Sequence, residues 1–309
     1  MSHLVNVVQF PHPGGEHDPG DAEVMPWNSA DHRRKFLQSP GRWSDPQGTV
    51  REGKVTFWGE WEAPSRIVGR WPAQGDLPRF LHEPLLSEMP SSGYAQNIDP
   101  LVFGPRFRYS NCKQFDRHRG HPTGMQDLTP GSVILFGSKQ PGRTAFALDT
   151  VFVVANSQPY ALRDGDSLGA EPFVQRTVVA PLRTGPGWEH LAFTLFDGAT
   201  HVDPVAGMFS FVPCMSVDRE PFRFARPVID LPGFINPKSQ QSPSGYTERH
   251  RVTLQTASDA WRAVVAQVFA SGCVLGHSLT EPELLAPGAA KTADDGEAAA
   301  RNPRQRRTC

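Results

Sequence analysis

The sequence predicts an α+β fold that is mostly β. Short runs rich in Val, Ile and Phe recur along the chain, and their lengths of about 4–8 residues are typical of strands. The chain of 309 residues contains 28 glycines and 30 prolines, which indicates many turns. One segment near the C-terminus has the apolar spacing of an amphipathic helix.

Composition limits the classes of function. Hydrophobic residues make up 38% and charged residues 20%, which is ordinary for a soluble globular protein. The formal net charge is −1, so the whole molecule exerts no general attraction on nucleic acid. A nucleic-acid site would therefore have to be a local basic patch.

The four cysteines are widely spaced, and none forms a Cys-x-x-Cys pair. This spacing predicts neither a zinc site nor a disulfide framework. The N-terminus has no signal-peptide pattern, and no apolar run approaches membrane-span length. We expect no membrane partner, no cofactor and a cytoplasmic location. The oligomeric state stays open.

The first predicted strand covers residues 4–10, and a loop rich in Pro and Gly follows it. His12, Glu16 and His17 in this loop carry side chains that can ligate a metal. The prolines and glycines exclude a helical ligand pair here. An ordinary polar loop, bonded to neighbouring backbone, explains the same residues, so we assign no metal.

Residues 27–37 are predicted to form a short helix, capped by Ser29 or Asp31. Consecutive cations would spread over most of its circumference. They are the best phosphate-binding candidates in the chain, although a solvated helix face would look the same. These residues are His32, Arg33, Arg34 and Lys35.

A second strand is predicted within residues 54–65, and residues 65–71 are expected to continue the sheet. Alternation along this strand places Trp58 and Glu60 on one face. An indole for stacking and a carboxylate acceptor together suit a nucleobase. The alternative is that Trp58 is a structural core residue. Residues 72–90 are expected to form a loop.

Residues 133–136 and 147–154 are predicted to pair as antiparallel strands, because a loop separates two apolar runs and a Pro-Gly turn precedes them. A polar segment lies upstream and could line a pocket. Ser110 and Asn111 could instead satisfy turn backbone, with Cys112 in the core. The candidate pocket residues in this segment are Tyr109, Ser110, Asn111 and Lys113.

The order of motifs in residues 96–155 resembles the PUA-like domains known as nucleotide-modification-associated domains, and more distantly ASCH and EVE domains. The matching residues are Asp99, Pro100, Phe103, Ser110, Cys112, Lys113, Gly131, Gly137 and Ser138. The resemblance implies a small β-barrel, centred on residues 96–215, that cradles a nucleobase or nucleic acid. It implies no chemistry by itself.

The C-terminal half is predicted to add strands, a Pro-rich connection and a helix. The helix is expected at residues 258–271, with Ser258 or Thr256 as its cap and Gly272 after its end. We expect one globular domain over residues 1–285 and a disordered tail over 286–309. Strands are expected at 173–179, 188–198, 208–214 and 249–254, and the Pro-rich connection at 222–244.

Three functions fit these observations. The first is binding of nucleic acid or a modified base by a PUA-like barrel, in DNA modification or phage defence. The second is an enzyme acting on nucleotides or nucleic acid, in which Lys113 lowers the pKa of a nucleophilic Cys112 and Glu16 or Glu60 moves protons. The third is a structural or partner-binding protein. The sequence contains no catalytic triad motif, phosphate loop or dinucleotide fingerprint.

Overall fold

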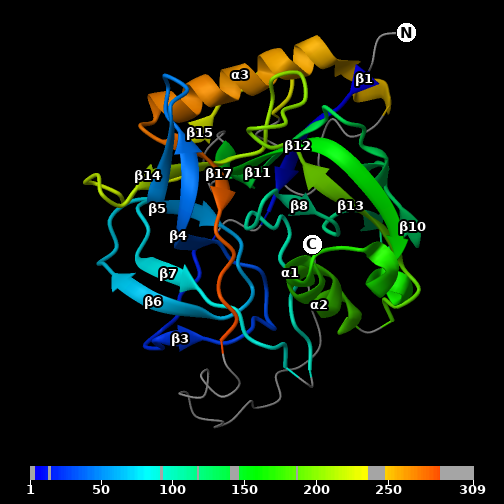
Figure 1. The fold of residues 1–309 in the computed structure, drawn as a ribbon, viewed down its shortest axis with the longest axis horizontal. Coiled ribbons are helices and arrows are strands. Elements are labelled where there is room, and N and C mark those ends of the chain that lie inside the picture. Colours follow the sequence, from blue (N-terminus) through cyan, green and yellow to red (C-terminus); the bar gives the residue numbers. More distant parts are fainter. Residues whose placement is uncertain are drawn as a thin grey trace.

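The structure, a computed structural model, describes residues 4–12, 15–90, 93–116, 118–139, 146–185, 187–235 and 248–285. Within these ranges strands clearly outweigh helices, as predicted (Figure 1). Among the described residues, no helix is long and apolar enough to cross a membrane. The predicted tail, residues 286–309, lies outside the described ranges.

The first of two large sheets has seven strands in the order β17-β14-β5-β4-β7-β6-β3. Strand β17 also pairs with β4, so β4, β5, β14 and β17 close into a small barrel. None of its four strands lies in residues 96–155, where the resemblance was found, and only part of β14 falls within residues 96–215, where the barrel was expected. The strands are β3 (Val24–Met25), β4 (Lys35–Ser44), β5 (Val50–Gly59), β6 (Ser65–Arg70), β7 (Phe80–Pro84), β14 (Val212–Ser216) and β17 (Val274–Leu279).

The second sheet has the order β2-β11-β12-β13-β8, and β15 pairs with β12 off this path. The predicted antiparallel pair is confirmed as β11 and β12, with Val133 opposite Val153. Strand β2 adds in parallel on the other side of β11. The strands are β2 (Val7–Pro11), β8 (Arg108–Tyr109), β11 (Val133–Lys139), β12 (Phe146–Ala161), β13 (Ala192–Gly198) and β15 (Val228–Ile229).

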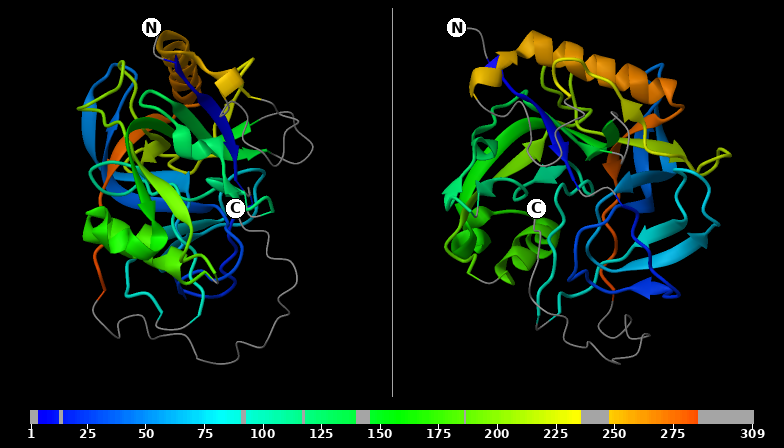
Figure 2. Two further views of the ribbon diagram at one scale, coloured as in Figure 1. Left: turned by 90° about the vertical axis from the view of Figure 1, so that its right-hand side faces the viewer. Right: turned by 180° about the vertical axis from the view of Figure 1, so that it is seen from behind.

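Helix α3 (Leu254–Ala270) lies along one end of the molecule, above strands of both sheets (Figures 1 and 2). Its cap is Thr253, whose side chain accepts from the backbone N–H of Thr256. One face is buried, with Trp261 and Val264 among the covered residues. Two short pairs complete the strands: β1 (Leu4–Val5) with β16 (Val252–Thr253), and β9 (Phe115–Asp116) with β10 (His121–Pro122).

Several sequence predictions were wrong. Residues 72–90, expected to form a loop, contain β7, and α3 begins earlier than predicted, with Thr253 as its cap in place of Ser258 or Thr256. Residues 27–37 form no helix; they run extended into β4, because the segment pairs with β5. Residues 173–179 are helical, not a strand, in the run of α1 (Pro172–Val174), a π-turn (Gln175–Val179) and α2 (Ala180–Arg183). Pro172 suits a first helical turn, and the buried apolar residues recur at helical spacing.

Two hydrophobic clusters form the core, and each draws on both sheets. Phe57 of β5 and Phe136 of β11 belong to one cluster. Phe36 of β4, Leu135 of β11 and Trp261 of α3 belong to the other. The two sheets therefore pack against each other through shared apolar surface. The junction between them is where the charged residues described next are found.

Candidate functional site

A cluster of charged side chains lies in the interior where the two sheets meet. The register of β4 and β5, continued beyond their paired ends, sets Arg34 opposite Glu60. Two residues further along, the same register sets His32 opposite Glu62. Because side chains alternate along extended chains, all four fall on one face. All four are buried.

The contacts in this cluster are close. Arg34 Nη2 lies 2.7 Å from Glu60 Oε2. His32 Nδ1 lies 3.0 Å from Glu60 Oε1 and 3.1 Å from Glu62 Oε1, so one ring nitrogen faces both carboxylates. The second oxygen of Glu62 accepts a hydrogen bond from Asn28 Nδ2.

The cluster continues into the second sheet. Asp149 of β12 has one carboxylate oxygen 3.8 Å from Arg34 Nε and the other 3.5 Å from Arg226 Nη1. His12, directly after β2, has its Nδ1 3.5 Å from Glu60 Oε2. The charged residues therefore connect the ends of β2, β4 and β5 with the first part of β12.

Burial and neighbouring charges set the protonation of these groups. Burial alone would lower the pKa of His32, but Glu60 and Glu62 raise it well above its usual value. Burial and the charges of Arg34 and His32 hold the pKa of His12 well below its usual value. Burial raises the pKa of Glu60, but His32 and Arg34 outweigh it and leave that pKa lowered. Thus His32 is an imidazolium and His12 a neutral imidazole.

Two buried groups in this region lack ordinary hydrogen bonds. Neither ring nitrogen of His12 and neither carboxylate oxygen of Asp149 has a hydrogen-bond partner among the described residues. Their ion-pair contacts, at 3.5–3.8 Å, are longer than hydrogen bonds. Unsatisfied buried polar groups are rare in proteins and concentrate at functional sites.

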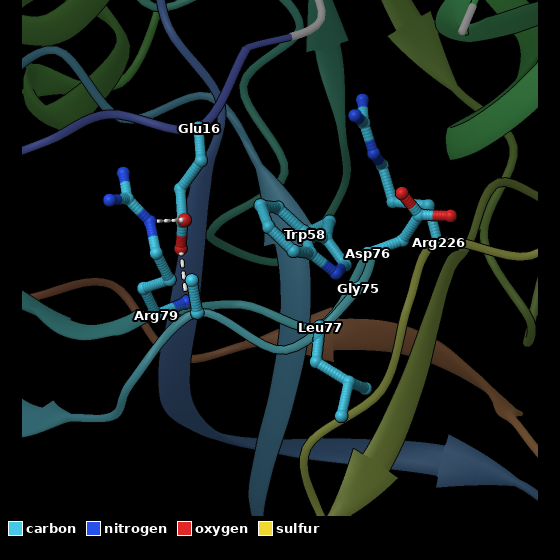
Figure 3. A pocket seen from close by; sticks show the side chains of 8 residues that line it. Glu16, Trp58, Gly75, Asp76, Leu77, Arg79 and Arg226 are labelled. Carbon is cyan, nitrogen blue, oxygen red and sulfur yellow. Dashed lines mark hydrogen bonds and ion pairs between the residues drawn. The ribbon is translucent and has the colours of Figure 1, made fainter.

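A pocket of about 380 Å³ opens beside the cluster. Trp58 lies in its middle, between the Glu16–Arg79 ion pair and the side chains of Arg226 and Asp76 (Figure 3). The guanidinium carbon of Arg226 lies 5.3 Å from the centre of the Trp58 ring. The lining residues are Glu16, Trp58, Ala73, Gly75, Asp76, Leu77, Arg79 and Arg226.

Trp58 is held firmly. Its indole N–H donates to the carbonyl of Phe224 at 2.9 Å, and 5% of the residue is exposed. Glu60, predicted to share its face, lies in the buried cluster and does not line the pocket. Arg226 belongs to both places, because it lines the pocket and contacts Asp149. It therefore links the pocket to the cluster.

The predicted cationic group does not form a basic surface. Only Arg33 is exposed, because His32, Arg34 and Lys35 point into the interior from an extended segment. Lys35 Nζ donates to the carbonyl of Trp61. A helix would have spread the four residues around its circumference. In the extended chain His32 and Arg34 share one face and Lys35 lies on the other, and all three are buried because both faces are covered there.

The residues after Arg108 are organised by Asp99. Its carboxylate accepts hydrogen bonds from the backbone N–H groups of Ser110, Asn111 and Cys112. Burial raises the pKa of Asp99 to about 6, although these three bonds oppose the shift. Cys112 itself is 1% exposed.

The predicted pocket residues in this segment bond to the protein interior. Tyr109 is fully buried and donates to the carbonyl of Cys112. Ser110 Oγ lies 2.6 Å from the hydroxyl of Tyr160, and Asn111 Nδ2 donates to Asn97 at 3.2 Å. Lys113, at a backbone φ of 64°, is half-buried. None of these predicted residues lines the pocket described above.

His12, Glu16 and His17 diverge in the structure. His12 faces Glu60, Glu16 bonds to Arg79, and the ring of His17 lies 5.7 Å from that of His82. Within the described ranges, the group of ligating side chains close enough to hold a metal ion is His32, Glu60 and Glu62.

Sequence reasoning missed Asp149, Arg226 and the pairing of His32 with Glu62. Asp149 did leave a signal, since it is a charged residue inside the apolar run of β12. Arg226 left none, because the Pro-rich segment around it has no periodicity. Comparisons with protein-family models, with curated proteins and with solved structures found no match.

Proposed function

We propose that this protein binds a nucleobase-containing ligand, a nucleotide or a nucleic acid, at the pocket around Trp58 and Arg226. The observation that carries the proposal is the cation–π contact of the Arg226 guanidinium with the Trp58 indole at the wall of a pocket of about 380 Å³. That volume falls in the usual range for small-molecule sites, roughly 300–1,000 Å³.

The chemistry of the lining suits a base. A planar base can stack on the guanidinium of Arg226, because arginine planes are common stacking partners of bases. The carboxylate of Asp76, on an exposed loop, can accept from an exocyclic amine or a ring N–H. Two acids balance two arginines in the lining, so the pocket favours a base with at most a small phosphate charge.

The resemblance of residues 96–155 to PUA-like domains supports the same class of ligand. That resemblance implies a nucleobase cradled by a small β-barrel, in a setting such as DNA modification or phage defence. Trp58 stands on β5, which is one of the four strands of the closed barrel. A small barrel thus contributes Trp58 to the pocket, although its four strands lie outside residues 96–155, so the barrel and the resemblance are separate observations.

Tryptophan fluorescence tests the proposal. The protein is titrated with nucleosides, mononucleotides and short DNA and RNA, plain and base-modified, at two salt concentrations. We expect saturable quenching that survives the higher salt, because stacking is less sensitive to salt than phosphate contacts. Asp76→Ala should weaken binding about tenfold, as expected for loss of one hydrogen bond worth about 1.4 kcal/mol.

The chain offers a matched control for the arginine. Arg223 lies 5.1 Å over the ring of Trp71, as Arg226 does over Trp58, but it does not line the pocket. Arg226→Lys should weaken binding and Arg223→Lys should not. The proposal is wrong if no probe binds, or if Asp76→Ala and Arg226→Lys both leave the affinity unchanged.

A further inference from the structure

We propose that His32, Glu60 and Glu62 form a binding site for one divalent transition-metal ion. This inference goes beyond the proposed function, because none of the three residues lines the pocket. It rests on the geometry of the three ligand atoms, on the groups that hold them, and on the charge and unsatisfied nitrogen beside them.

The ligand atoms are already spaced for a metal. Each of the three residues offers one atom, and these atoms lie within 4.8 Å of one another. The Nδ1 of His32 is 3.0 and 3.1 Å from the facing oxygens of Glu60 and Glu62. Ligands bound tetrahedrally to zinc at about 2.0–2.1 Å lie about 3.3 Å apart. Shifts of a few tenths of an ångström would therefore suffice for the two His–Glu pairs, and the two glutamate oxygens lie within 4.8 Å of each other.

Outer contacts orient both carboxylates toward the same point. Glu62 receives a hydrogen bond from Asn28 on one oxygen and presents the other to His32. Glu60 receives a 2.7 Å hydrogen bond from Arg34 on one oxygen and likewise presents the other to His32. Such partners are typical of metal sites, where they fix the orientation of the ligands.

His12 provides an independent observation at the site. It is nine-tenths or more buried, and its ring nitrogens have no hydrogen-bond partner among the described residues. Its Nδ1 lies 3.5 Å from Glu60 Oε2, on the carboxylate whose other oxygen faces His32. An unsatisfied imidazole at this carboxylate is suited to bond a water beside the ligand group.

The charges around the ligands favour a cation. Glu60 and Glu62 place two buried carboxylates against one ring nitrogen of His32. Buried charges are costly unless they are paired or coordinate a metal. A divalent cation between these carboxylates and the ring nitrogen would supply such a partner.

The ligand set indicates the class of ion. One imidazole nitrogen with two carboxylate oxygens suits Zn²⁺, Mn²⁺ or Fe²⁺ better than the soft ions that prefer thiolates. Mn²⁺ is the most useful probe, because it binds oxygen and imidazole ligands and has little affinity for cysteine. The three described cysteines, which are buried and form no disulfide with one another, then do not confuse the result.

The experiment measures metal bound to the full-length protein. After treatment with a chelator, the protein is titrated with Mn²⁺ and free Mn²⁺ is followed by electron paramagnetic resonance; zinc content is measured after dialysis against Zn²⁺. We expect about one ion per chain and a higher Tm with metal, because a ligand of the folded state stabilises it. Glu62→Gln should abolish stoichiometric binding.

Two further variants separate a metal site from a general effect of substitution. Asn28→Ala retains all three ligands but removes the hydrogen bond to Glu62, and should weaken binding about 10- to 100-fold, as loss of an outer partner does. His277→Gln alters a buried histidine outside the cluster and should bind as the unaltered protein does. Absence of binding to the unaltered protein, or equal binding by Glu62→Gln, would overturn the inference. Either result would leave the nucleotide proposal untouched.

Discussion

His12 and His32 show how the environment of a single residue sets its charge. Both are buried next to Glu60, yet His12 is neutral and His32 charged, because only His32 approaches two carboxylates at hydrogen-bonding distance. Their residue types were visible in the sequence, which suggested metal ligation for one and phosphate binding for the other. Their partners were not visible, because Glu60 lies more than 25 positions away from each.

His277 makes the stability of the protein depend on pH. Burial, with the charges of His201 and Arg42, lowers its pKa to about 4. Burial of the neutral His277 ring therefore contributes its full stability above about pH 6.5, the pKa of an unfolded histidine. That stability is lost as the pH falls toward 4, because the unfolded chain binds the proton first. The loss is about 1.4 kcal/mol for each pH unit in that window. Urea unfolding at pH 7 and pH 5 measures it.

The matched variant is His277→Gln, whose amide can still bond Ser44, the partner of the His277 ring at 3.1 Å. Other buried histidines contribute equally in both proteins. Between pH 7 and pH 5 the unaltered protein should therefore lose about 1–2 kcal/mol more than the variant. Equal losses would show that His277 does not carry this pH dependence.

Gly137 marks a place where a side chain cannot fit. It lies at the register shift between β11 and β12, and an added Cβ would come 2.2 Å from the carbonyl oxygen of Ala147. Since backbone must move, Gly137→Ala should reduce the free energy of unfolding by about 1–3 kcal/mol. Gly59→Ala is the control, because its Cβ would have contacts of 3.4 Å or more. Similar effects of both substitutions in denaturant unfolding would contradict the expectation.

At the scale of elements, the predicted strands and helices were correct where the local pattern of apolar residues was strong. Strand β11 and helix α3 lie within a few residues of the predicted ranges, whereas β12 begins near its predicted start but continues seven residues beyond its predicted end. The strand predicted for residues 173–179 was wrong. Val and Thr favour strands, but packing of Phe173, Val174 and Val178 on the core selected a helix. The helix predicted for residues 27–37 was also wrong, because pairing with β5 favoured an extended chain over the helix that the capping residues suggested.

The start of α3 gives a test at this scale. Thr253 Oγ1 accepts from the N–H of Thr256 at 3.1 Å. Thr253→Ala leaves that N–H without its cap and should destabilise the protein by about 1 kcal/mol, whereas Thr253→Ser keeps the acceptor and should cost much less. Thermal unfolding followed by circular dichroism compares them. A serine variant as unstable as the alanine variant would mean that the cap contributes little.

For the whole molecule, the two sheets share both hydrophobic clusters. The ion pairs of Asp149 with Arg34 and Arg226 also join β12 to residues outside its sheet. Helix α3 contacts β15 in one sheet and β17 in the other. Separating the sheets would expose both clusters and strip buried charges of their partners, which costs several kcal/mol for each broken pair.

We therefore expect the described sheets to unfold together. Tryptophan fluorescence reports mainly on the first sheet and its surroundings, where Trp43, Trp58 and Trp61 are buried, whereas far-ultraviolet circular dichroism reports on all strands and helices. The two signals should give coincident denaturant transitions. A fluorescence transition at clearly lower denaturant than the circular dichroism transition would show that the sheets unfold independently.

The β-rich class, the strands around residues 133–154 and the C-terminal helix follow from local patterns of apolar residues, because each pattern spans fewer than about 20 positions and reports its own burial. The candidate sites follow from tertiary pairing. Register between β4 and β5 turned four charged residues toward one point, and packing of the second sheet brought Asp149 to them. Such contacts join residues 26 to 115 positions apart, as with Arg34 and Glu60 or Arg34 and Asp149, and no local pattern encodes which partners meet.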